Sequence, residues 1–161
     1  MREPTATAPR MPAGYGAPSD GSGAAVLPWS WAVERLERAH NYWVCTTRAD
    51  GRPHAVPVWG LWLEDAFWFS TGRTSAKGRN LVRNPAIVVH LESGDETVIL
   101  EGDAEEASGD LERYADAYEA KYAYRPSTVD ETNVTYVLRP RAAQTWTESG
   151  FPRDATRWDF E

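Results

Sequence analysis

The segment from residue 42 to residue 70 constrains the fold of this chain most strongly. Runs rich in β-branched and aromatic side chains, typical of strands, cover residues 42–47, 53–63 and 66–70. Asp50 and Gly51 separate the first two runs, and this pair favours a tight hairpin because glycine accepts the positive φ that such turns require. A second short turn at Glu64 and Asp65 precedes the third run. The pattern predicts three consecutive antiparallel strands.

Pro57 lies inside the second of these runs. Proline has no backbone N–H and cannot donate to a strand ladder, so within a sheet it is confined to edges and bulges. The sequence therefore predicts an edge or a bulge at Pro57, with neighbouring backbone groups left free for a ligand.

The rest of the chain supplies more strands and three helices. Further strand-like runs cover residues 86–91, 97–104, 134–139 and 142–147, and Pro140 separates the last two. Helical spacing of apolar residues predicts helices over residues 30–41 and 110–122 and a short one that stops before Asn84 and Pro85. We expect a mostly β (α+β) fold with six to seven antiparallel strands and three short helices. Closure into a barrel would remove the exposed strand edges.

We expect a single domain over residues 29–161, because 161 residues that are 42% hydrophobic suit one core. Residues 1–28 are rich in Pro, Ala, Gly, Ser and Thr, which predicts a disordered or loosely attached leader. The last residues include Trp158 and Phe160, and such an aromatic tail is expected to dock on the domain.

Composition excludes several classes of function. A net charge of −7 argues against general binding to nucleic acid or to anionic membranes, and no apolar run approaches the roughly 20 residues that cross a bilayer. The one cysteine, Cys45, cannot form an internal disulfide, which fits a reducing cytoplasm. His54 and His90 lack the partners that a metal site needs, so no metal is expected. The sequence identifies no catalytic acid, base or nucleophile.

An anion-binding turn is predicted where the third strand leads into the short helix. Thr74 and Ser75 supply hydroxyls at the helix start, and Lys77 and Arg79 follow in its first turn, where free backbone N–H groups already favour an anion. The alternative is an ordinary capped surface helix with solvated basic side chains.

Several of these segments together resemble a known family. The chain resembles the pyridoxamine-phosphate-oxidase-like split-barrel flavoproteins, and among them the actinobacterial flavin/deazaflavin oxidoreductases, over roughly residues 30 to 160. The resemblance implies a split barrel and a homodimer whose two cofactor clefts lie between subunits. It is carried by the following motifs: Tyr42-Trp43-Val44, Ala49-Asp50-Gly51-Arg52-Pro53-His54, Pro57-Val58-Trp59-Gly60, Phe69-Ser70-Thr71-Gly72, Ser75-Ala76-Lys77-Gly78-Arg79-Asn80-Leu81 and Asn84-Pro85.

The resemblance also implies which residues bind the cofactor. Ser75 and Lys77 match the family's phosphate-binding Ser-x-Lys motif, whereas Ala76 stands where many relatives that hold flavin mononucleotide (FMN) have an arginine. Fewer cationic contacts favour the deazaflavin coenzyme F420 over FMN. The expected cofactor-binding residues are Pro57, Val58, Trp59, Ser70, Thr71, Ser75, Lys77, Arg79, Asn80, Arg157 and Trp158.

The resemblance implies an oxidoreductase that passes a hydride from reduced F420 to an unsaturated or carbonyl-bearing small molecule. Pyridoxamine oxidases carry an Arg-x-His substrate pair near the C-terminus, whereas this tail reads Arg157-Trp158-Asp159, so oxidation of pyridoxamine phosphate is not expected. We expect Trp158 to stack on the cofactor ring. The alternatives are an FMN-dependent reductase or oxidase, and a protein that binds a flavin, deazaflavin or tetrapyrrole without turnover.

Overall fold

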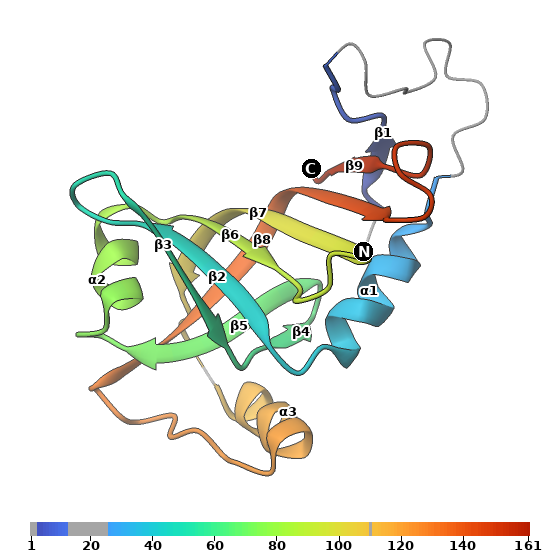
Figure 1. Cartoon of the computed structure of the whole chain (residues 1–161). Coiled ribbons are helices and arrows are strands. Elements are labelled where there is room, and N and C mark those ends of the chain that lie inside the picture. The colour runs from blue at the N-terminus through green and yellow to red at the C-terminus, as the bar shows by residue number, and fades with distance from the viewer. Residues whose placement is uncertain (1–2, 13–25, 110) are drawn as a thin grey trace.

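The computed structural model describes residues 3–12, 26–109 and 111–161. In these residues one antiparallel sheet of nine strands is accompanied by three helices (Figure 1). The strands are β1 (Thr5–Thr7), β2 (Tyr42–Thr47), β3 (Pro53–Val58), β4 (Leu61–Leu63), β5 (Ala66–Gly72), β6 (Ala86–His90), β7 (Glu96–Glu106), β8 (Asn133–Thr147) and β9 (Thr156–Asp159). The helices are α1 (Trp29–Arg38), α2 (Ala76–Arg83) and α3 (Glu112–Tyr122).

The sheet curls into a barrel that is open along one side. The strands follow the order β3-β2-β6-β7-β8. Strand β5 then pairs with the edge of β8 that faces away from β7. Among the described residues no ladder joins β3 to β5, so the barrel is split between these two strands. The mostly β split-barrel prediction is confirmed, and Pro57 lies on an edge strand as expected. No helix in the described part of the chain is long and apolar enough to span a bilayer.

Aromatic and aliphatic side chains from the inner face of the barrel form its core. Tyr42, Phe67, Phe69 and Leu138 are fully buried there. Helix α1 packs across one end of the barrel, where Leu36 is buried (Figure 1). Helix α2 packs on β2 and β5 at another side of the molecule, and α3 lies outside the barrel next to β4.

The last two predicted strands are one continuous strand, β8, which runs through Pro140. The proline is tolerated because the ladder between β7 and β8 shifts register between Glu101 and Gly102, directly opposite it. Gly102 is needed at this bulge, since a Cβ atom there would lie 2.7 Å from Leu138 Cδ1. The prediction of two strands was wrong because a bulge can absorb a proline without ending the strand.

The predicted strand over residues 53–63 is two strands, β3 and β4, which are separated at Trp59 and Gly60. Gly60 is buried, and a Cβ atom there would lie 2.5 Å from the ring of Phe67. The chain bends at this glycine and pairs with β5 instead of continuing along β2.

Both ends of the described chain join the sheet at the same edge. Strand β9 pairs with β8, which confirms the expected docking of the tail. Strand β1 adds to β9 with Ala6 opposite Trp158. Residues 5–7 therefore form a strand and differ from the loosely attached leader expected over residues 1–28, of which residues 1–2 and 13–25 lie outside the described residues.

Candidate cofactor site

The turn between β5 and α2 forms a compact cap on the helix start. The Ser75 hydroxyl accepts a hydrogen bond from the Gly78 N–H at 3.1 Å and lies 3.0 Å from the Thr71 hydroxyl. Gly78 permits this close turn, because a Cβ atom there would lie 2.6 Å from the Gly72 carbonyl oxygen. The N–H groups of Ala76 and Lys77 find no backbone acceptor among the described residues, so they remain free for an anion.

Lys77 and Arg48 give this turn a positive potential, which also acts on the neighbouring His54. Lys77 is half-buried, forms no ion pair with a described residue, and has its pKa lowered by burial. His54 on β3 has its pKa lowered by burial and by the positive charges of Arg48 and Lys77. A partly buried ammonium without a counter-ion costs stability, and a bound anion would offset that cost. We call Thr71, Ser75 and Lys77, with the free N–H groups, the anion cradle.

The opening between β3 and β5 extends away from the cradle. His54 is near its cationic end, and Trp59 follows the other end of β3, about 16 Å further along an extended chain. The edge of β3 that faces away from β2 pairs with no strand in the described part of the chain, which leaves its backbone groups available to a ligand. Pro57 is exposed and Val58 half-buried beside the core. The opening thus combines an anion site with a strand edge and an aromatic end.

Trp59 has one covered face and one available face. Its ring stacks on Tyr122 of α3, with centroids 4.7 Å apart and planes 7° from parallel. It is nevertheless 41% exposed. A half-exposed indole at the end of an open strand edge is suited to contact a flat ligand.

Two predicted phosphate ligands on α2 have structural contacts instead. The Asn80 side-chain N–H group donates to the Thr46 hydroxyl at 2.9 Å, and Asn80 is 7% exposed, so it attaches α2 to β2. The exposed Arg79 guanidinium donates to the Thr74 carbonyl oxygen. The cradle therefore keeps Lys77 as its inward cation, and the Asn80 amide N–H group, which was expected to bind the cofactor, is bonded to Thr46 in this structure.

Ser70 is separated from the cradle although it precedes Thr71. Successive side chains of a strand point to opposite faces, so Thr71 faces Ser75 whereas Ser70 faces α3. The Ser70 hydroxyl lies 3.0 Å from the Tyr114 hydroxyl and 2.8 Å from that of Thr135. The sequence grouped two neighbours that the strand places on different faces.

The tail residues are not brought to the cradle within one chain. Trp158 is 3% exposed, donates its indole N–H to the Thr145 hydroxyl at 2.9 Å and packs against Trp29 at 5.5 Å. Arg157 donates to Asp159 at 3.1 Å. Strand β9 and helix α2 lie on opposite sides of the molecule (Figure 1). The expectation that Trp158 stacks on the cofactor was wrong, because core packing covers the ring.

Sequence reasoning missed His54 as a neighbour of the cradle. The hairpin register places His54 opposite Thr46, and the two side chains lie 3.4 Å apart. Because the Asp50-Gly51 turn fixes that register, counting back from it would have placed His54 on the same face as Val58.

Comparisons with known proteins support the fold. The family model for pyridoxamine 5'-phosphate oxidase matches residues 32–147, more than half of the chain. A conserved hypothetical protein from Mycobacterium tuberculosis is 22% identical, with a TM-score of 0.67 over 79% of this chain and 90% of that one. A structure named F420 reductase is 24% identical, with a TM-score of 0.58 over 68% of this chain and 93% of that one.

A third similar structure is a pyridoxamine 5'-phosphate oxidase-related, FMN binding protein from Nostoc punctiforme. It is 18% identical, with a TM-score of 0.58 over 83% of this chain and 91% of that one. No protein with a curated function matches. These likenesses concern the fold, and the choice of cofactor depends on the residues of the cradle.

Proposed function

The chain belongs to the pyridoxamine 5'-phosphate oxidase family, and we propose that it is an oxidoreductase that uses coenzyme F420. The observation that carries this proposal is the anion cradle at the open side of the barrel, in which half-buried Lys77 has no counter-ion among the described residues. The similar structure named F420 reductase supports the choice of cofactor.

The residues of the opening have separable roles in this proposal. Ser75, Lys77 and the free N–H groups would hold the cofactor's phosphate. The edge of β3 at Pro57 and Val58, together with Trp59, would border the ring and exclude water from it. Bound reduced F420 supplies the hydride that an unsaturated or carbonyl-bearing substrate accepts. The protein thus contributes binding, orientation and exclusion of water.

FMN is the second candidate, because a similar structure is an FMN binding protein. Ala76 adds no cation to the cradle, whereas many relatives that hold FMN have an arginine at this position, so F420 is favoured here. Position 76 is half-buried beside Lys77, and Ala76→Arg would add a guanidinium next to the free N–H groups.

We also propose that the protein is a homodimer. The outer face of β2, β3 and β6 carries apolar side chains that the single chain leaves partly uncovered: Trp43, Cys45, Ala55, Pro57 and Val88. Trp43 stacks on His90 at 6.3 Å on this same face. Burying such an aromatic surface is a common way to stabilise a subunit interface.

Titration of the purified chain with each cofactor tests the proposed function. We expect F420 to bind more tightly than FMN, and Ala76→Arg to shift the preference towards FMN. Reduced F420 should then be oxidised when menadione is added as a carbonyl-bearing acceptor. Binding without any oxidation, tested over several acceptors, would instead support a cofactor carrier, and the absence of binding by either cofactor would refute the cradle assignment. Light scattering that gives the mass of one chain would refute the homodimer.

A further inference from the structure

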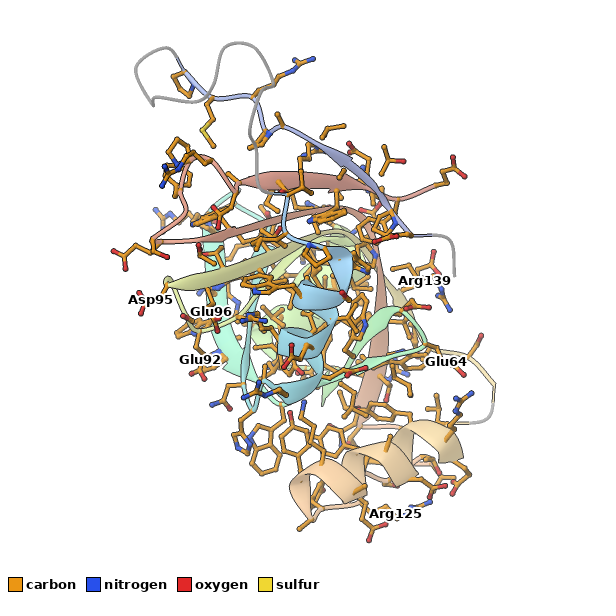
Figure 2. All side chains as sticks on the ribbon, turned by 90° about the vertical axis from the view of Figure 1, so that its right-hand side faces the viewer. Glu64, Glu92, Asp95, Glu96, Arg125 and Arg139 are labelled. Atoms are coloured by element: carbon orange, nitrogen blue, oxygen red, sulfur yellow. The ribbon has the colours of Figure 1, made fainter. Side chains whose placement is uncertain are left out.

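A second cleft lies on the face of β5 and β8 that carries Ser70. Its volume is about 490 Å³, and the loop over residues 123–132, which connects α3 to β8, forms one side. Figure 2 shows α3 standing off from the sheet, with side chains filling the space between them. The residues that matter for the argument are Ser70, Tyr118, Tyr124, Val129, Val134 and Thr135.

The cleft has hydroxyl groups with unused hydrogen-bonding capacity. The Ser70 hydroxyl contacts those of Tyr114 and Thr135, and because a serine hydroxyl has one donor and two acceptor sites, one site remains. Tyr118 is 8% exposed, lines the cleft, and its hydroxyl forms no hydrogen bond with a described residue. The Tyr118 oxygen is not one of the buried unpartnered atoms of the described residues, so it is open to water, and a ligand with a polar substituent could take the place of that water.

The charged side chains around the cleft are largely paired. The Arg73 guanidinium binds the Glu106 carboxylate, one contact being 3.1 Å, and donates to the Glu131 carbonyl oxygen at 3.1 Å. The Asp130 carboxylate accepts from the backbone and hydroxyl of Thr132 and from the side chain of Asn133. The Glu131 side chain is exposed at the rim, where water solvates it. The only cation that lines the cleft is thus already paired, so an anionic ligand would lose hydration without gaining a free counter-ion among the described residues.

Aromatic and aliphatic side chains lie at the mouth of the cleft, beside further polar residues of the loop. The ring of Tyr118 lies 6.4 Å from that of Tyr124, which is 59% exposed, and Val129 is 86% exposed. Arg125 binds Asp116 and Glu119 of α3 and so holds the loop close to the helix. Exposed apolar side chains at the mouth of a cleft favour a ligand that covers them.

From these contacts we infer that the cleft binds a planar aromatic molecule that has one hydrogen-bonding substituent and no negative charge. Its ring contacts Tyr118 and Tyr124, and its substituent reaches the Ser70 hydroxyl. The cleft borders the anion cradle at Thr71, but the Ser70 hydroxyl, which the substituent would reach, lies on the opposite face of β5 from the Thr71 hydroxyl. The inference does not depend on which cofactor the cradle holds.

The test uses the full chain without cofactor, labelled at its methyl groups, and two probes. 2-Naphthol carries the required hydroxyl and naphthalene lacks it. We expect saturable shifts of the Leu111 and Val134 methyl groups with 2-naphthol, because both residues line the cleft. Ser70→Ala should weaken 2-naphthol about fivefold, the equivalent of one neutral hydrogen bond, and leave naphthalene binding unchanged. Thr47→Ala, an exposed hydroxyl at the end of β2, is the matched control and should change neither probe.

Three results would overturn the inference. The first is that the methyl groups of the cleft do not shift up to the solubility limit of 2-naphthol. The second is that shifts occur instead at the methyl groups of Val58, next to the exposed Trp59. The third is equal weakening of both probes by Ser70→Ala. If Ser70→Ala does not fold, Tyr124→Ala removes an exposed ring that the inferred ligand contacts. A loss of 2-naphthol affinity with this variant would support the inference, and unchanged affinity would refute it.

Discussion

The anion cradle around Lys77 and the aromatic cluster around Trp158 differ in how completely their polar groups are paired. The Trp158 indole N–H has its acceptor and its ring is covered. Lys77 is half-buried without an ion pair among the described residues, beside N–H groups that lack acceptors. Paired and covered groups stabilise the fold, whereas unpaired polar groups cost stability unless a ligand binds them. The unpaired groups at the cradle therefore indicate a ligand site.

The largest expected effect is on the structural side of this comparison. Trp158→Ala should lower the free energy of unfolding by about 3–5 kcal/mol, because it opens a cavity against Trp29 and removes a buried hydrogen bond. Urea unfolding measures the loss, and Trp158→Phe, which keeps much of the ring, should lose less. Near-normal stability in Trp158→Ala together with lost cofactor binding would return Trp158 to the cofactor site.

Lys77→Ala is the corresponding change on the cradle side. We expect cofactor affinity to fall about tenfold or more, since a charge-assisted phosphate contact contributes roughly 1.5–3 kcal/mol. Unfolding free energy should change by less than about 0.5 kcal/mol, because no ion pair is lost. Arg79→Ala is the matched control, since its guanidinium contacts the Thr74 carbonyl and is exposed. Equal affinities of the Lys77 variant and the unaltered protein would exclude the cradle.

Asn80→Ala sharpens the comparison within a single helix. Asn80 belongs to the same sequence motif as Lys77, yet its side chain is bonded to Thr46. The expected result is a loss of about 1 kcal/mol of stability, with a smaller change in cofactor affinity than Lys77→Ala produces. Denaturant titration and cofactor titration of the same preparation separate the two. A larger loss of affinity than of stability would place Asn80 among the ligands.

The smallest effect concerns Lys121, a half-buried cation that donates two hydrogen bonds. Its ammonium donates to the Tyr42 hydroxyl at 2.8 Å and to the Gly60 carbonyl oxygen at 3.2 Å, and burial lowers its pKa to about 8. Between pH 8 and its ordinary pKa the unfolded chain binds more protons, so this group increases stability as pH rises through that window. Below pH 8 its penalty is constant.

Comparing the unaltered protein with Lys121→Met isolates this contribution. The difference in melting temperature should change in favour of the unaltered protein between pH 7.5 and pH 9.5. The upper limit keeps the measurement below the range in which exposed tyrosines of the unfolded chain ionise. A difference that stays constant over this range would show that the Lys121 pKa is not lowered in the folded protein.

The sequence alone determined the elements whose cause is local. Asp50 and Gly51 predicted the β2–β3 hairpin, and Gly51 has the positive φ of 81° that the turn requires. The Ser75 cap on α2 could likewise be predicted, because capping needs only the residues of one helical turn. Alternation of apolar residues predicted the strands, and the barrel follows from the need to bury them.

Tertiary structure decided which of these residues share a surface. Ser70 and Thr71 are neighbours in sequence, but their side chains lie on opposite faces of β5. Helix α3 covers the face that carries Ser70, and the cradle lies on the face that carries Thr71. Asn80 donates a hydrogen bond to Thr46, and Trp158 packs in the core with its indole N–H bonded to Thr145. In both cases the partner comes from another element of the fold. A sequence motif specifies residue types at a fixed spacing along the chain. The direction of each side chain, its burial and its hydrogen-bond partners depend on contacts between strands, which form only when the sheet closes.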